Sequence, residues 1–204
     1  MRHHIARGCL ALLLLSSVSA QSSNSISSEQ IFKALELREG MTVCEIGAGS
    51  GALTLAAAKI VGPTGRVFTN ELGDDRVKKL RGAVDAAAVT NVTVVAGAAE
   101  TTNFPAAACD ALFMRDVYHH LPNPAAVHAS IAASLRPGAR VAVVDFTPPN
   151  AEAATPADRS KDGMHGVMPD TVAAEMKAAG FEVVSTERGQ RWFLVVLQRP
   201  RGRP

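Results

Sequence analysis

Apolar residues along this chain follow two spacings, and the two alternate through most of the sequence. Short apolar runs rich in β-branched residues indicate buried strands, and apolar residues that recur every three or four positions indicate helices. Val77, Leu80 and Val84 show the helical spacing, whereas the apolar run at 139–145 is nearly continuous. The predicted strands cover residues 42–46, 66–70, 92–95, 110–116, 139–145, 181–186 and 192–198. The predicted helices cover 29–37, 52–60 and 124–135, and two more begin at Asp74 and Pro169.

This order predicts one α/β domain. Strands that alternate with helices form a parallel sheet covered on both faces, and the last two strands are joined by a short hairpin at 187–190. We therefore expect a seven-stranded, mostly parallel sheet with one antiparallel strand from the C-terminal hairpin and with helices on both faces. The domain is expected to cover 29–199, after a serine-rich linker at 21–28 and before a basic tail at 200–204.

A glycine-rich turn follows the first predicted strand. Gly47, Gly49 and Gly51 alternate along the turn, with Ala48 between the first two. Glycine lets the backbone turn sharply and lets a ligand lie against bare peptide, and this turn leads the ligand to unpaired N–H groups at the start of a helix. Glu45, two residues before the first glycine, would repel a phosphate and would attract a positively charged ligand.

The stretch from Glu45 to Gly51 resembles the first motif of the class I methyltransferases that depend on S-adenosylmethionine (SAM). In that motif an acid and one apolar residue precede Gly-x-Gly-x-Gly. The resemblance covers 28–198 and implies a Rossmann-like fold, SAM as the cofactor and a small-molecule methyl acceptor, as in methyltransferases of type 11/25. The turn also fits a nicotinamide-binding Rossmann motif, because Ala52 can take the last position of G-x-G-x-x-G/A.

The resemblance also indicates which residues meet the cofactor. Glu71, at the end of the second strand, would accept hydrogen bonds from both ribose hydroxyls. Many family members hold the adenine with an acid directly after the glycine that ends the third strand, but this chain has Ala98 there. Either Glu100 replaces that acid, or backbone groups alone bind the adenine. The expected cofactor-binding residues are Glu45, Gly47, Ala48, Gly49, Gly51, Glu71, Leu72, Ala98, Ala99 and Asp116.

A segment with two adjacent histidines follows the fourth predicted strand. The sequence DVYHHLP at 116–122 resembles a motif that follows this strand in small-molecule methyltransferases. The first and fourth strands flank the point where strand order reverses, so this segment should lie beside the glycine turn. His119 and His120 are the candidate bases if the acceptor must lose a proton. Tyr118 and His165 are expected to contact the acceptor.

His165 lies in a long polar segment at 146–168. Such a loop inside a compact domain is typical of a functional loop or a lid. His119, His120, His165 and Asp116 together offer groups that metals bind, but their spacing in the sequence selects no metal, so none is predicted.

The first twenty residues differ from the rest. A basic start with Arg2 and Arg7 precedes a short apolar run at 9–18 and small residues at 18–20. This is the pattern of a secretory signal cleaved before Gln21, and the run is too short to span a bilayer comfortably. We expect an exported protein, periplasmic or secreted, with no stable membrane insertion after cleavage. An uncleaved amphipathic helix would leave the chain in the cytoplasm, where SAM is made.

Charge and cysteines add two expectations. Removing residues 1–20 takes two of the 21 basic side chains and none of the 19 acidic ones, which leaves a formal net charge of zero. Without a clustered basic face we expect no nucleic-acid partner. Cys44 lies near the end of the first strand and Cys109 at the start of the fourth. Even in adjacent strands the two would lie several residues out of register, too far apart for a disulfide. We therefore expect them to remain buried free thiols.

The expected reaction is direct in-line displacement, in which an acceptor attacks the methyl group and the sulfur departs. The sulfonium leaves readily, so the protein mainly holds two reactants close together, an effect worth roughly 7–11 kcal/mol of barrier. Two alternatives fit the same pattern: an NAD(P)-dependent oxidoreductase on the same sheet, and an exported, non-catalytic binding protein with the SAM fold.

Overall fold

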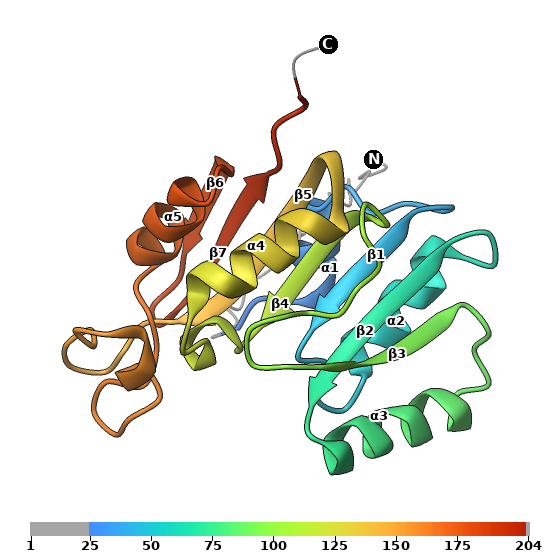
Figure 1. Cartoon of the computed structure of the whole chain (residues 1–204), viewed down its shortest axis with the longest axis horizontal. Coiled ribbons are helices and arrows are strands. Elements are labelled where there is room, and N and C mark those ends of the chain that lie inside the picture. The colour runs from blue at the N-terminus through green and yellow to red at the C-terminus, as the bar shows by residue number, and fades with distance from the viewer. Residues whose placement is uncertain (1–24, 203–204) are drawn as a thin grey trace, which may run out of the picture.

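A computed structural model of the chain describes residues 25–202 (Figure 1). The predicted signal peptide and the first half of the predicted linker, residues 21–24, lie outside the described residues. None of the helices within 25–202 has the length and apolar character needed to cross a bilayer.

The centre of the domain is a seven-stranded sheet. Its strands are β1 (Thr42–Ile46), β2 (Arg66–Leu72), β3 (Val92–Gly97), β4 (Cys109–Arg115), β5 (Leu135–Phe146), β6 (Glu182–Arg188) and β7 (Trp192–Gln198). Their order is β3-β2-β1-β4-β5-β7-β6. β1 to β5 pair in parallel, and β7 pairs antiparallel with both β5 and β6. The predicted fold class is therefore confirmed, including the single antiparallel strand from the C-terminal hairpin.

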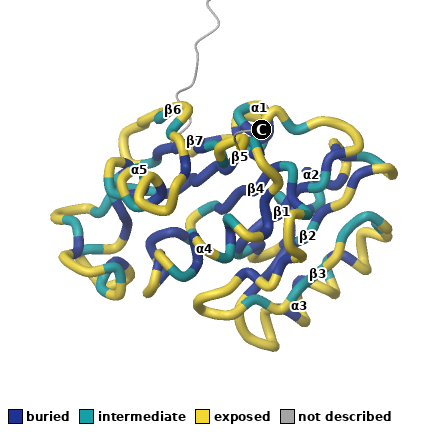
Figure 2. Tube along the Cα trace, turned by 45° about the horizontal axis from the view of Figure 1, so that its top comes forward, coloured by how far each residue is buried: buried dark blue, intermediate teal, exposed yellow. Residues whose placement is uncertain are grey.

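Helices cover both faces of the sheet (Figure 1). They are α1 (Ser28–Ala34), α2 (Ala52–Val61), α3 (Asp74–Ala86), α4 (Pro124–Ser134) and α5 (Pro169–Ala178). Alternate residues of a strand point to opposite faces, so Phe113 of β4 packs with α1 and α2, whereas Met114 packs with α4 and α5. Figure 2 shows the buried strands between helices that expose their outer sides.

The first helix begins one residue earlier than predicted. The side chain of Ser27, and not that of Ser28, accepts a hydrogen bond from the backbone N–H of Gln30. The side chain of Gln30 in turn accepts from the N–H of Ser27 at 2.9 Å. This reciprocal capping box satisfies two N–H groups that the helix leaves unpaired.

The two cysteines form a disulfide, which corrects the expectation of free thiols. Cys44 on β1 and Cys109 on β4 are both fully buried, and their Cα atoms lie 5.9 Å apart, within the range that a disulfide requires. The prediction assumed a regular ladder that would hold Cys109 several residues out of step. The pairing of β4 with β1 begins only at Ala111, which lies opposite Val43, so Cys109 precedes that ladder. The first residue of β4 therefore leaves the regular spacing on which the prediction relied.

Candidate functional site

A cleft of about 630 Å³ lies over the carboxyl ends of β1, β2 and β4. Ligands of open α/β sheets bind at this edge, where the strand order changes direction between β1 and β4. The volume falls in the range of small-molecule sites. Among the predicted cofactor residues, those that line the cleft are Gly47, Gly49, Glu71, Leu72, Ala98, Ala99 and Asp116.

The glycine turn forms one wall of the cleft, and all three of its glycines adopt a left-handed backbone. Gly47 has a φ of +70°, and a Cβ added there would lie only 2.5 Å from a methyl group of Val117. Gly49 has a φ of +55° and faces open space. A side chain at Gly49 would therefore be strained and would project into that space.

Glu71 links the end of β2 to this turn. Its Oε1 accepts a hydrogen bond of 2.7 Å from the N–H of Gly49, and its Oε2 accepts one of 3.1 Å from the N–H of Leu72. Arg76 pairs with Oε2 at 3.4 Å. Each oxygen keeps a lone pair for a further donor, so the carboxylate is held in place on the cleft wall and can still bind a pair of hydroxyls.

Glu45 lies beneath the glycine turn and not among the residues that line the cleft. Its side chain is 3% exposed, and its carboxylate accepts hydrogen bonds from the hydroxyls of Thr54 on α2 and Thr69 on β2. Burial raises the pKa of Glu45 to about 7, and the two hydroxyl bonds partly oppose that effect. This placement corrects the expectation of direct contact with a cationic ligand, because the carboxylate instead joins β1, β2 and α2 under the turn.

Ala48 and Gly51 also face inward. The N–H of Ala48 donates to the carbonyl of Asn70 at 3.0 Å, and the N–H of Gly51 donates to the carbonyl of Ala48 at 2.9 Å. A Cβ added at Gly51 would lie 3.0 Å from a methyl group of Leu80 on α3. These two residues hold the shape of the turn, whereas Gly47 and Gly49 line the cleft.

Ala98 and Ala99 line the cleft beyond the end of β3. Glu100 does not line it, since its carboxylate accepts a hydrogen bond of 2.9 Å from the side chain of Asn123, the residue that caps α4. Of the two alternatives for the adenine, this geometry favours recognition by backbone groups.

A second cavity of about 490 Å³ adjoins the cleft and shares Arg115 and Asp116 with it. Phe146, Arg191 and Trp192 also line this cavity. Asp116 has a left-handed φ of +56°, a conformation that aspartate tolerates better than most residues. Its side chain is 55% exposed and pairs with Arg115 at 3.7 Å, so this pair stands between the two cavities.

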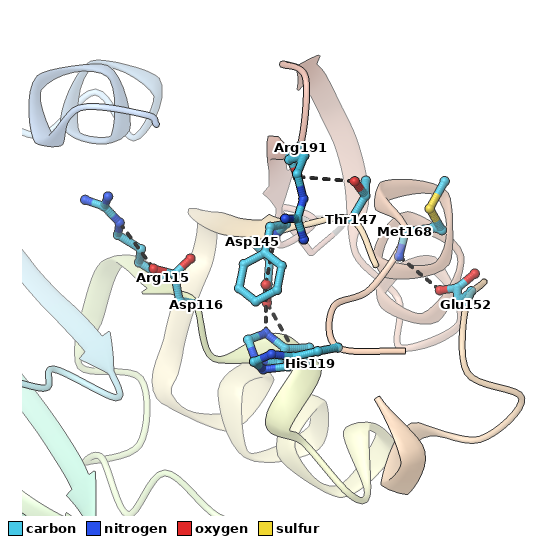
Figure 3. Close-up of polar contacts among 10 residues, drawn as sticks. Arg115, Asp116, His119, Asp145, Thr147, Glu152, Met168 and Arg191 are labelled. Carbon is cyan, nitrogen blue, oxygen red and sulfur yellow. Dashed lines mark hydrogen bonds and ion pairs between the residues drawn. The ribbon is translucent and has the colours of Figure 1, made fainter. Parts of the chain in front are cut away.

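His119 is buried against an acid at the end of β5 (Figure 3). Its Nδ1 lies 2.8 Å from Oδ1 of Asp145, and its backbone N–H donates to Oδ2 at 3.1 Å. The two side chains are 2% and 0% exposed. Because Nδ1 faces a carboxylate, it carries the proton, and Nε2 is left as an acceptor. His165 fills that position, with its Nε2 2.9 Å from Nε2 of His119.

His120 and Tyr118 point to different environments. His120 is exposed and lines the cleft. Partial burial, together with the neighbouring His119 and His165, lowers the pKa of His120 below 6.5. Tyr118 is fully buried, and its hydroxyl donates to Oε2 of Glu175 at 2.7 Å. This burial corrects the expectation that Tyr118 contacts the acceptor.

The segment between β5 and α5 is held at several points along its length. Arg159 is 4% exposed, and its guanidinium donates to both carboxylate oxygens of Glu175 on α5, at 3.2 and 2.5 Å. Glu152 accepts from the N–H of Met168 at 3.0 Å (Figure 3). The contact between His165 and His119 adds a third attachment.

Two residues of the site were not predicted. Asp145 holds His119, and Asn70 bridges the turn and the loop after β3. The side-chain oxygen of Asn70 accepts from the N–H of Gly47 at 3.1 Å, and its amide donates to the carbonyl of Thr102 at 2.9 Å. A usable signal was present, because each is a polar residue at the carboxyl end of an apolar strand, where ligands of such sheets bind.

Comparison with known proteins shows which protein family this chain resembles. A family model described as a methyltransferase domain matches residues 23–186. A ubiquinone/menaquinone biosynthesis C-methyltransferase, UbiE, from Shewanella pealeana is 34% identical over 119 residues, which are 56% of this chain and 46% of that protein. A protein-L-isoaspartate O-methyltransferase from Ignicoccus hospitalis is 34% identical over 90 residues, 44% of this chain and 43% of that protein. The chain spans about half the length of these curated relatives.

The fold agrees with that family. The crystal structure of a SAM dependent methyltransferase from Aquifex aeolicus superposes with a TM-score of 0.72 at 24% identity, over 84% of this chain and 89% of the other. The family model covers most of the chain, and the sheet carries a glycine turn after β1 and an acid at the end of β2 at the edge where ligands of such sheets bind. The chain therefore belongs to the class I SAM-dependent methyltransferase family.

Proposed function

We propose that this chain transfers the methyl group of SAM to a small-molecule acceptor by direct in-line displacement. The observation that carries the proposal is the pair of adjoining cavities that share Arg115 and Asp116. One cavity has the wall of a nucleoside site, with bare glycine peptide and a fixed carboxylate. The other provides a separate volume for a second reactant within reach of the first.

In this proposal SAM lies in the larger cleft. Glu71 accepts hydrogen bonds from the ribose hydroxyls, and Leu72 contacts the adenosine beside it. The adenine lies against the backbone at Ala98 and Ala99. The methionine part lies along Gly47 and Gly49, which directs the methyl group toward Asp116. Glu45 acts from below, as a positioning residue that fixes the turn.

The acceptor occupies the second cavity. Phe146 and Trp192 offer aromatic surface, and Arg115 and Arg191 offer positive charge. Such walls suit a compact organic molecule with an apolar body and an oxygen-bearing or anionic group. The Shewanella pealeana relative is named for quinone biosynthesis, and an acceptor with a flat ring would fit the same chemistry.

Most of the rate then comes from holding the two reactants in line, an effect worth roughly 7–11 kcal/mol. An acceptor hydroxyl must also lose a proton, and His120 is the histidine that lines the cofactor cleft. Its lowered pKa leaves the ring neutral near pH 7, so it can accept that proton. His119 would act behind it, as a positioning residue held by Asp145.

We also propose that the chain works outside the cytosol. The amino-terminal pattern is that of an export signal, and the buried Cys44–Cys109 disulfide suits an oxidising compartment. This location requires a supply of SAM there.

Two measurements on the purified chain test the proposed reaction. Titration calorimetry with SAM should give one site per chain, and incubation with SAM and a panel of small acceptors should release S-adenosylhomocysteine. Thermal protection by NADH and not by SAM would instead identify a nicotinamide oxidoreductase. SAM binding without turnover on any acceptor class would favour the non-catalytic alternative.

A further inference from the structure

The fold brings a distant histidine, His165, to the adjacent pair His119 and His120. One ring nitrogen from each of His119, His120 and His165 falls within 4.8 Å of one from each of the others. The ring centroid of His119 lies 4.0 Å from that of His120 and 4.6 Å from that of His165. The first two are adjacent in the loop after β4, and the third reaches them from the segment between β5 and α5.

From this arrangement we propose that His119, His120 and His165 form a binding site for one divalent transition-metal ion, with zinc as the first candidate. Imidazole nitrogens suit zinc, copper, iron and nickel ions. Three protein ligands that leave a fourth position open are the usual set of a catalytic zinc site. Metal binding does not depend on the methyl-transfer reaction proposed above.

The surroundings of His119 support this assignment. A metal-binding histidine commonly donates its other ring N–H to a carboxylate, which fixes the tautomer and orients the ring. Asp145 supplies that carboxylate to Nδ1 of His119 at 2.8 Å, and it also accepts the backbone N–H groups of His119 and Phe146. The lone pair on Nε2 of His119 is therefore directed at the other histidines before any ion arrives.

The distance between the two facing nitrogens is consistent with a cluster that can open to hold an ion. Nε2 of His119 and Nε2 of His165 lie 2.9 Å apart. Ligand bonds of about 2.0–2.1 Å in a tetrahedral site place two nitrogens about 3.3 Å apart. A small rotation of the exposed His165 ring would supply the difference. His165 now donates the proton between them, and moving that proton to its Nδ1 frees the second lone pair without changing the charge of either ring.

The position of the cluster suggests what an ion would do. His120 lines the cofactor cleft, and Phe146, whose ring lies 4.7 Å from His119 and 5.2 Å from His165, lines the second cavity. An ion here would lie near the junction of the two cavities, where it would lower the pKa of a bound acceptor hydroxyl or thiol. This role, unlike the site itself, rests on the proposed function, and it replaces the role of His120 as base: with an ion bound, His120 is a ligand, and the ion-bound acceptor releases its proton to solvent.

The test uses the full chain, freed of metal with a chelator and then titrated with Zn²⁺ by calorimetry and with Co²⁺ by visible absorption. We expect one equivalent of either ion, with Co²⁺ bands typical of tetrahedral coordination. Asp145→Asn should weaken binding about 10- to 100-fold, and His165→Ala should remove the Co²⁺ bands. His128→Gln is the matched control, because His128 packs against Tyr118 outside the cluster, and it should bind as the unchanged chain does.

Because His3 and His4 are present in every variant, they cannot account for a difference between His165→Ala and the control. Equal Co²⁺ spectra and affinities in the unchanged chain and His165→Ala would overturn the site. So would the absence of binding in a folded, metal-free chain, which would leave the cluster as a hydrogen-bonded histidine relay. SAM titration of the same metal-free sample tests the proposed function separately, because the cofactor cleft does not require the ion.

Discussion

The backbone N–H of Gly49 lies 2.7 Å from Oε1 of Glu71, and this bond joins the glycine turn after β1 to the end of β2. The two residues are 22 positions apart in the sequence. Because the bond fixes the carboxylate before any ligand arrives, the cofactor side of the cleft is organised in advance. A ligand that uses both groups loses little further freedom on binding.

Replacing Glu71 tests this arrangement. Glu71→Ala should weaken SAM binding about 10- to 100-fold, because each hydrogen bond to a charged group contributes about 1.5–3 kcal/mol. Titration calorimetry measures the effect. Asp75→Asn, at an exposed acid in the first turn of α3, is the control and should bind normally. Equal affinities in the two variants would remove Glu71 from the cofactor site.

A side chain at Gly49 should block the cleft. Gly49→Val places a β-branched residue at a φ of +55°, which that residue type strongly disfavours, and fills open space on the cleft side of the turn. We expect SAM binding to fall at least about 10-fold, the equivalent of 1.4 kcal/mol. Gly82→Ala on α3 meets nothing within 4 Å and should raise stability by about 0.5–1 kcal/mol without changing affinity. Normal binding by Gly49→Val would contradict the proposed path of the methionine part.

Glu45 should make stability depend on pH. Its pKa is about 7 in the folded chain against 4.5 for an ordinary glutamate, so between these values the folded chain holds a proton that the unfolded chain releases. The free energy of unfolding therefore falls as pH rises through this window, by about 2–3 kcal/mol between about pH 5 and about pH 8. Glu45→Gln should lack this component. Urea unfolding of both chains at the two pH values measures it, and parallel pH dependences would show that Glu45 is not buried as described.

The disulfide should contribute substantially to stability. Cys44 and Cys109 are 65 residues apart, and closing a loop of that length in the unfolded chain is worth about 4 kcal/mol. The double variant Cys44→Ala/Cys109→Ala should lose up to that amount in denaturant unfolding. Reductant should destabilise the unchanged chain to the same extent and leave the double variant unaffected. Two titratable thiols in the unreduced chain would show that the bond is absent.

His120→Ala should separate proton transfer from cofactor binding. With a hydroxyl acceptor we expect turnover to fall about 10²- to 10⁴-fold, while SAM affinity stays unchanged. In the unchanged chain kcat/KM should rise with pH through the pKa of His120, which lies below 6.5 because the ring is partly buried. This rise of kcat/KM with pH should be absent from the variant. A variant that keeps both rate and pH profile would show that His120 is not the base.

Local patterns were enough to predict the fold, and most of the predicted cofactor residues line the cleft. The period of the apolar residues located every strand of the sheet, and the bare turn with an acid after β2 identified the cleft, because both depend on short stretches of sequence. The direction in which each side chain points was harder to predict from the sequence. Glu45 and Tyr118 were expected to meet ligands, yet Glu45 is buried against the helix that follows the glycine turn, α2, and Tyr118 against the distant helix α5.

Contacts between distant segments account for the remaining differences between the prediction and the structure. Cys109, which meets Cys44, precedes the first pair of the β1–β4 ladder, and no periodicity reveals where that ladder begins. Likewise, His165 reaches His119 from 46 positions away, so its role depends on how a long loop folds back. Asp145 and Asn70 carry a recoverable signal, because each is a polar residue at the carboxyl end of an apolar strand.

The ion pair between Arg159 and Glu175 fastens the segment that carries His165 to α5. Pulling the segment before α5 outward would separate a guanidinium that is 4% exposed from its carboxylate, and breaking a buried pair costs about 3–5 kcal/mol. In the proposed reaction the acceptor lies beside Phe146, whose ring is 5.2 Å from that of His165, so this segment would act as a fixed wall and not as a moving cover. Discrimination among acceptors would then follow their rigid shape and not their ability to induce closure.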